Sequence, residues 1–446
     1  MKKTVLVLTG LFFNKEGNQS MLETLLGFCD EFEVDFVSVA DRKSDFYYSK
    51  EDVETLLKGV RIFAPKMICL SLMRILRGFS RKMLTFLSIG YGTRALKETS
   101  TIIVNSSFSL VSKIAFLARE HYLYCFSKRL IKCKHKKYDI VIAYEINAIR
   151  PALRVKERLL PSTTVVGKFQ GTVLGSLPES EQNRANRLFW ADTKALSFAY
   201  KLDGCIMTND GTRGKQVLQK YGVQVNRILF VPNGVSSLCE EKQKEVRESK
   251  RLFSYPIQLF TLSRLVYWKR VDLGPKIISA LVNKFNNKNF RLTIFGAGST
   301  EDVRRIREII KEYNVSDYVD YRGPIPYEET PEIFAGYDIL LSLYIMNNIT
   351  NPLLEAVFYG IPVMTIYKVD LAKLIGERVR GCILLKDSEN EKELIQQAAE
   401  QLNNTDIGRL QEMYSYMENG STNIGTWDQR MSKELEFIRN LKRCHE

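Results

Sequence analysis

Short apolar runs alternate along the chain with longer stretches in which apolar residues recur every three or four positions. The first pattern is typical of buried strands and the second of helices, so the alternation predicts strand–helix units in parallel sheets. The expected strands of the first half are residues 4–9, 34–39, 140–144, 164–167 and 204–208. Those of the second half are residues 258–262, 291–295, 319–321, 339–343 and 362–365. Two such series in 446 residues predict two α/β domains.

The boundary between these domains is expected in residues 236–255, a charged segment with few apolar residues. It follows Pro232-Asn233-Gly234, a turn sequence that closes the first series. We therefore expect an N-terminal domain at 1–235, a second domain at 236–420 and a C-terminal helix within 421–446.

The eight cysteines are scattered and form no C-x-x-C pair, which argues against a zinc site or a disulfide framework and favours a reducing compartment. Met1-Lys2-Lys3 and the apolar run after it could imitate a signal peptide. A buried first strand explains them better, because no small-residue cleavage site follows. No apolar run reaches the roughly 18 residues of a membrane span. We expect a protein of the cytoplasm, on the inner face of the membrane.

Positive charge is concentrated in one segment. Residues 66–137 hold 15 Lys and Arg and two acids, or +13 of the chain's net +14. Within it, a helix over 67–87 would separate Arg74, Arg77 and Arg81 from a face of large apolar side chains. This pattern fits a helix on an anionic membrane surface, and it also fits an ordinary domain helix with a wet basic face. A nucleic-acid partner is disfavoured, because no known binding module is recognisable.

Arg264 and Lys269 directly follow the expected strand at 258–262, so they belong in a loop at the ligand-facing end of a sheet. Two cations there can hold a diphosphate and neutralise it as it leaves. They could equally be solvated surface charges. Gly296-Ala297-Gly298 follows the next strand and would let a phosphate or sugar approach the backbone, although a tight turn also explains it.

Residues 351–363 read as a helix that starts near Pro352 and ends at Gly360, followed by a strand. Leu353, Val357 and Phe358 form its core-facing side. Glu355 lies apart from them, in an apolar setting where an unpaired carboxylate is costly. It could accept the two hydroxyls of a ribose, or it could simply favour the helix dipole.

Together with Pro232-Asn233-Gly234, Arg322-Gly323 and Tyr337-Asp338, these segments resemble the donor half of glycosyltransferase family 4. The resemblance covers residues 204–363 well and the first 200 residues only in outline. It implies the GT-B fold, with two Rossmann-like domains facing across a cleft and a C-terminal helix that returns to the N-terminal domain. It assigns Arg264 and Lys269 to the donor diphosphate and Glu355 to the ribose. The further donor-binding candidates are Asn347, Asn351, Leu354, Gly296, Arg322 and Gly17.

The chain departs from the family at two positions. Where relatives often have a Glu eight positions before the match to Glu355, this chain has Asn347, which cannot carry charge. Where many relatives have a histidine after the strand at 164–167, it has Gln170. Retention in this family is pictured as same-face attack assisted by the leaving phosphate, so Gln170 would orient a substrate as a catalytic residue, or be an ordinary loop amide.

The resemblance therefore implies a retaining, metal-independent hexosyltransferase that uses a nucleoside-diphosphate sugar and no other cofactor. Its three histidines lie outside the cleft segments, which makes a metal site unexpected. The expected acceptor is a saccharide or a lipid-linked saccharide, used in surface polysaccharide or glycoconjugate synthesis. A GT-B-like partner subunit without activity remains the alternative, because of Asn347.

Overall fold

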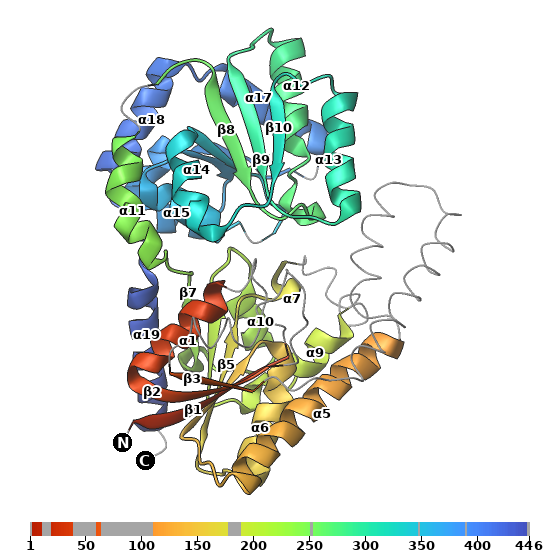
Figure 1. Cartoon of the computed structure of the whole chain (residues 1–446), viewed down its shortest axis with the longest axis vertical. Helices are drawn as coiled ribbons and strands as arrows, with labels where there is room; N and C mark the ends of the chain where they lie inside the picture. Colours follow the sequence, from red (N-terminus) through yellow and green to blue (C-terminus); the bar gives the residue numbers. More distant parts are fainter. Residues whose placement is uncertain are drawn as a thin grey trace. The chain divides into compact units, whose positions relative to one another are not determined.

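The computed structural model describes residues 2–10, 19–38, 59–63, 110–176, 189–249, 253–346, 348–388 and 390–443. The chain divides into two compact units. The first consists of Met1–Pro232 and Arg430–Glu446, and the second of Asn233–Gln429. Each unit contains a parallel sheet with helices packed around it (Figure 1). The predicted α/β class is confirmed.

The sheet of the first unit has the strand order β3-β2-β1-β4-β5-β6-β7, and every neighbouring pair is parallel. Its strands are β1 (Lys3–Thr9), β2 (Phe32–Val37), β3 (Val60–Phe63), β4 (Ile140–Tyr144), β5 (Thr164–Phe169), β6 (Gly204–Thr208) and β7 (Ile228–Val231). The winding direction reverses between β1 and β4, where Thr9 lies opposite Tyr144. Ligands of open α/β sheets bind beyond the carboxyl ends of the strands at such a reversal.

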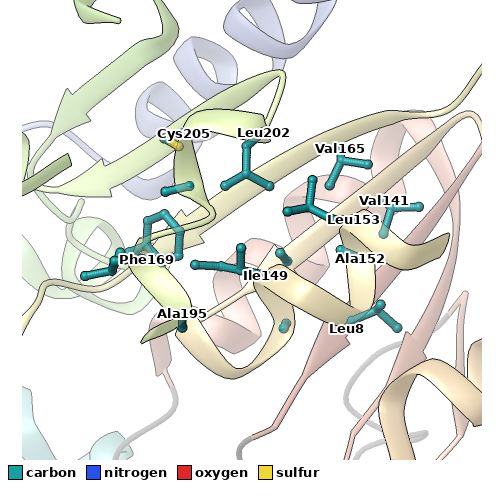
Figure 2. Close-up of a cluster of buried hydrophobic side chains, with 14 of the residues drawn as sticks. Leu8, Val141, Ile149, Ala152, Leu153, Val165, Phe169, Ala195, Leu202 and Cys205 are labelled. Atoms are coloured by element: carbon teal, nitrogen blue, oxygen red, sulfur yellow. The ribbon is translucent and has the colours of Figure 1, made fainter. Parts of the chain in front are cut away.

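Alternate residues of a strand point to opposite faces of the sheet, so both faces are apolar here and both are covered by helices. Leu6 and Leu8 of β1 pack in the cluster that includes helices α5, α6 and α9, part of which Figure 2 shows. Val5 and Val7 face the other way, toward α1 and α19. The helices of this unit are α1 (Gln19–Glu31), α5 (Leu110–Cys133), α6 (Ile149–Arg158), α7 (Val173–Ser176), α9 (Trp190–Leu196), α10 (Gly214–Lys220) and most of α19 (Trp427–Arg443).

The sheet of the second unit repeats this topology with the order β10-β9-β8-β11-β12-β13. Its strands are β8 (Ile257–Leu262), β9 (Phe290–Phe295), β10 (Val319–Gly323), β11 (Ile339–Ser342), β12 (Val363–Ile366) and β13 (Ile383–Leu385). The reversal lies between β8 and β11, which pair in parallel. The carboxyl ends of these two strands are therefore the expected ligand site of this unit.

Two apolar clusters cover the two faces of this second sheet. One includes Leu259 with residues of α12, α13, α17 and α18, and the other includes Phe260 with residues of α11, α14, α15 and α16. The helices are α11 (Ser237–Glu248), α12 (Leu273–Lys284), α13 (Thr300–Glu312), α14 (Thr330–Gly336), α15 (Asn351–Tyr359), α16 (Val369–Ile375), α17 (Glu391–Asn403) and α18 (Ile407–Asn419). The charged segment at 236–255 thus contains helix α11, whose Cys239 and Val246 are buried.

All ten strands predicted from the sequence are confirmed within a few residues, and β3, β7 and β13 are additional. The C-terminal helix α19 packs on the first unit as expected, with Met431 against Gly27 of α1. Among the described residues, no helix combines the length and apolar character of a membrane span. Arg74, Arg77 and Arg81, with the helix expected at 67–87, lie outside the described residues.

Candidate functional site

Arg264 and Lys269 lie in the loop between β8 and α12, at the carboxyl end of the second sheet. Arg264 is exposed and Lys269 is half-buried. The Nζ atom of Lys269 lies 3.8 Å from the ring centroid of Tyr344, a buried residue of the loop after β11. Because a cation is attracted to the face of an aromatic ring, Tyr344 helps to fix the position of Lys269.

Tyr344 is a meeting point for three segments of this unit. The loop after β11 is tied to the loop after β8 by a hydrogen bond of 3.0 Å from the Ile345 amide to the Trp268 carbonyl. Burial raises the pKa of Tyr344, and the hydroxyls of Ser263 and Thr350 are among the groups that lower it. Since Thr350 is the N-cap of α15, both loops and the start of this helix converge on one phenol.

The glycines after β9 are required by the packing of loop on loop. Gly296 has φ +145°, and a Cβ atom there would lie 1.7 Å from the Ser263 carbonyl oxygen. The Leu265 amide donates to the Ala297 carbonyl at 2.7 Å. The N-terminus of α13 is closed by a capping box between Ser299 and Asp302. Close packing therefore explains the glycines, and contact of Gly296 with a donor stays a prediction.

Glu355 lies on α15 and is 3% exposed. The hydroxyl of Tyr327 donates to its Oε1 at 3.1 Å and lies 2.6 Å from Oγ of Ser236. Burial raises the pKa of Glu355 to about 7, while the hydrogen bond from Tyr327 lowers it. A buried carboxylate with a near-neutral pKa is a frequent feature of functional sites. Tyr327 and Ser236 hold it in place, and neither was singled out from the sequence.

The remaining donor-side candidates have different surroundings. Asn351 accepts a hydrogen bond of 2.8 Å from Asn233 through its side-chain oxygen. Leu354 is fully buried in the core of the unit. Arg322 is exposed on β10 and pairs with Asp320 at 2.9 Å. Asn347 and Gly17 lie outside the described residues. The donor-binding roles of all five remain predictions.

Gln170 follows β5 in the first unit, close to the carboxyl end of β4. Its Nε2 donates to the hydroxyl of Tyr144 at 2.9 Å, and its Oε1 accepts from the hydroxyl of Thr208 at 3.4 Å. Thr208 also accepts a 2.9 Å hydrogen bond from Arg430 of α19. These contacts fix the side-chain amide in one orientation. Such an amide is suited to orienting a substrate rather than to moving a proton.

A neighbouring residue that sequence reasoning missed is Glu145, the first residue after β4. Its backbone has φ +67° and ψ +164°, a region that essentially only glycine adopts and that costs another residue about 1–3 kcal/mol. The half-buried side chain of Glu145 accepts a hydrogen bond of 2.9 Å from the backbone amide of Gln170. An acidic residue directly after a buried strand was the only signal available in the sequence.

A buried ion cluster attaches α19 to this same sheet. The side chains of Lys168 on β5 and Glu434 on α19 form an ion pair and are both 0% exposed. Glu434 also accepts from Arg430 at 2.8 Å. Burial lowers the pKa of Lys168 to about 8. Burial alone would raise the pKa of Glu434, but the two cations bring it below its ordinary value. The cluster is therefore largely charged at neutral pH.

Residues 242–420 match the family model of the glycosyl transferases, group 1. The matched segment is thus similar to the group 1 glycosyl transferases. It contains Arg264, Lys269, Gly296 and Glu355. The residues around Gln170 lie in the other unit, outside the match.

Two curated proteins are similar to part of the chain. The GtfA subunit of the UDP-N-acetylglucosamine–peptide N-acetylglucosaminyltransferase of Streptococcus gordonii is 30% identical over 170 residues, 37% of this chain and 30% of that protein. The D-inositol 3-phosphate glycosyltransferase of Acidothermus cellulolyticus is 24% identical over 144 residues, 30% of this chain and 32% of that protein. The chain thus matches about a third of the length of each.

Solved structures are similar to the whole chain. Anabaena HepE in complex with UDP and glucose has a TM-score of 0.62 at 13% identity, with 98% of this chain and 100% of that chain covered. The sucrose-phosphate synthase of Thermosynechococcus elongatus has a TM-score of 0.63 at 14% identity, with 100% of both chains covered. At these identities the likeness concerns the fold, and the predicted GT-B fold is confirmed.

Proposed function

We propose that this protein is a retaining glycosyltransferase of family 4, which moves a hexose-type sugar from a nucleoside-diphosphate sugar to a saccharide acceptor. The observation that carries the proposal is the placement of Arg264 and Lys269 in the loop after β8 and of Glu355 on the helix after β11, the two strands at the reversal of the second sheet, within the segment that matches the group 1 family model. A nucleotide-sugar donor is supported by HepE, whose structures were solved with UDP and with UDP-glucose.

The transfer balances without a metal or another cofactor. An acceptor hydroxyl oxygen bonds to the anomeric carbon of the donor sugar, and the bond from that carbon to the diphosphate breaks. The electron pair leaves with the diphosphate, which also takes the hydroxyl proton. Arg264 and Lys269 stabilise the negative charge that develops there. Glu355 accepts the ribose hydroxyls, and Gln170 orients the acceptor on the first unit.

A thermal-stability screen with UDP-, GDP- and ADP-sugars tests this proposal. One nucleotide class is expected to raise the melting temperature, because a ligand at 100 times its Kd stabilises the folded state by about 2.7 kcal/mol. Release of the nucleotide should follow. A protein that binds the nucleotide sugar but never turns it over would instead be a GT-B-like partner subunit, the alternative that Asn347 leaves open. Absence of any stabilisation contradicts both.

Arg264→Ala and Lys269→Ala are each expected to reduce kcat by about 100-fold and to change donor affinity less, because the charge that they stabilise is greatest in the transition state. Nucleotide release at saturating donor and calorimetry with UDP separate the two effects. Arg304→Ala is the matched control, since Arg304 is an exposed arginine on α13 that pairs with Glu301. A normal kcat in both test variants would show that Arg264 and Lys269 are only solvated surface charges.

We further propose that the enzyme works on the inner face of the membrane, on a lipid-linked acceptor of surface polysaccharide or glycoconjugate synthesis. Residues 66–137 carry +13 of the net charge, and each Lys or Arg near an anionic leaflet contributes about 1 kcal/mol of attraction. The protein is expected to sediment with phosphatidylserine-containing liposomes and to dissociate at high salt.

Changing Arg74, Arg77 and Arg81 to Glu should abolish this sedimentation while UDP binding persists. The control carries the same charge change at Arg304, Arg307 and Arg409, which are exposed in the second unit. Equal sedimentation of both triple variants would contradict a specific membrane-binding segment and leave 67–87 as an ordinary domain helix.

A further inference from the structure

Glu145 occupies the ligand-facing position of the first sheet. It directly follows β4, at the reversal of strand order between β1 and β4. Its carboxylate accepts a 2.9 Å hydrogen bond from the backbone amide of Gln170, which follows the adjacent strand β5. Side chains at this point of an open α/β sheet are placed to meet a ligand.

The backbone of Glu145 is held in its glycine-like conformation from both sides. Its amide donates to the Lys168 carbonyl at 2.9 Å, and its carbonyl accepts from the Ala148 amide at 3.0 Å. Glycine would adopt φ +67° and ψ +164° without strain. If only the fold mattered, glycine would therefore suit this position better than glutamate. Strain of this kind persists where the side chain serves a function.

We infer that Glu145 is a substrate-binding residue on the acceptor side, and that its carboxylate accepts a hydrogen bond from the hydroxyl that is glycosylated, before that hydroxyl passes its proton to the leaving diphosphate. This inference rests on the proposed function and names the residue that orients the nucleophile. An ionised carboxylate is the stronger acceptor for a hydroxyl proton. The expected ligand class is a neutral hydroxyl, as in a saccharide, because Asp192 and Asp210 add negative charge nearby.

The charged and titratable groups around Glu145 come from four elements and from the loop after a fifth. They are Asp192 of α9, Asp210 after β6, Lys168 of β5, Tyr144 of β4, and Arg430 and Glu434 of α19. The pKa of Glu145 is raised to about 7, mainly by burial; Asp192 and Asp210 also raise it, and the backbone amide of Gln170 and the Lys168 cation lower it. Turnover at saturating donor should therefore rise with pH through about 7, as Glu145 ionises.

Glu145→Gln tests the inference, because it keeps the shape of the side chain and removes the charge. We would measure release of UDP from UDP-glucose and UDP-N-acetylglucosamine at saturating donor from pH 5.5 to 8.5, with water as the acceptor. The expected result is a kcat at least tenfold lower at pH 8 and a loss of the rise near pH 7, with the Kd of UDP within twofold of wild type. Glu157→Gln, at an exposed carboxylate of α6, should behave as wild type.

A kcat of Glu145→Gln within twofold of wild type would overturn the inference. So would a rise near pH 7 that Asp192→Asn abolishes and Glu145→Gln retains, because burial also raises the pKa of Asp192, to about 6.

The strain is tested separately by comparing melting temperatures of Glu145→Gly and Glu145→Ala, which both lack the carboxylate. Glycine should give the higher value here, whereas alanine is ordinarily the more stable residue. Alanine at least as stable as glycine would overturn the inference even if the wild type releases no UDP. A wild type that binds no nucleotide sugar contradicts the proposed function instead.

Discussion

Glu355→Ala is expected to weaken UDP binding by about 10- to 150-fold, the equivalent of 1.5–3 kcal/mol for hydrogen bonds to a charged group. The reason is that Glu355 is the carboxylate that we propose accepts the ribose hydroxyls, and it is 3% exposed in the second unit. Calorimetry with UDP measures the effect, and circular dichroism checks the fold. A Kd within twofold of wild type would remove Glu355 from the donor site.

The same residue should make UDP affinity depend on pH. Burial raises its pKa from 4.5 to about 7, so its protonated form stabilises the unliganded fold. That contribution is complete below pH 4.5 and is lost as pH rises through 7. Donor binding has the opposite dependence, because the ionised carboxylate is the stronger acceptor. Affinity should increase between pH 6 and 8. UDP titrates as well, so only the difference between wild type and Glu355→Gln reports on Glu355.

Tyr327→Phe provides a control that leaves the carboxylate in place. The substitution removes the hydroxyl that donates to Glu355 at 3.1 Å. Because this hydrogen bond lowers the pKa of Glu355, its loss should raise that pKa. The midpoint of the pH dependence should therefore move to higher pH, while affinity well above the midpoint stays near that of wild type. An unchanged midpoint together with reduced affinity at every pH would indicate a structural role for Tyr327 only.

The strands that the sequence predicts and those that it misses differ in their position in the sheets. Central strands are buried on both faces, so they appear as continuous apolar runs such as residues 140–144. The three missed strands, β3, β7 and β13, are all at sheet edges. They are three or four residues long, and β7 is buried fully only at Ile228. Short, half-exposed segments of this kind lack a distinctive hydrophobic pattern.

The candidate site divides along a similar line. Arg264, Lys269 and Glu355 could be proposed from the sequence because each directly follows a strand or lies in a recognisable helix. Glu145 and Tyr327 depend on backbone conformation and on contacts between distant segments. The bond from Tyr327 to Glu355 spans 28 residues, and the strain at Glu145 exists only in the folded chain. Spacing in one sequence gives no indication of either.

The largest effect on stability is expected at Glu434, which lies 266 residues from its partner Lys168. Glu434→Ala leaves two cations, Lys168 and Arg430, buried without their carboxylate. Removing one partner from a buried ion pair typically costs about 3–5 kcal/mol. Global unfolding of a two-unit chain need not be two-state. Native-state hydrogen exchange of α19 and β5 is therefore the appropriate measurement.

A second substitution separates lost charge pairing from lost packing. Lys168→Met in the Glu434→Ala background removes one uncompensated cation and keeps most of the apolar stem of the side chain. If unpaired charge causes the instability, the double variant should protect α19 better than Glu434→Ala alone, and a double-mutant cycle gives the coupling energy. If a cavity at position 434 causes it, Lys168→Met should destabilise the protein further.

Gln170 provides an independent readout, because Arg430 donates a hydrogen bond to Thr208 and Thr208 donates one to Gln170. Loss of the carboxylate should release Arg430 and reduce turnover even under conditions where the fold persists.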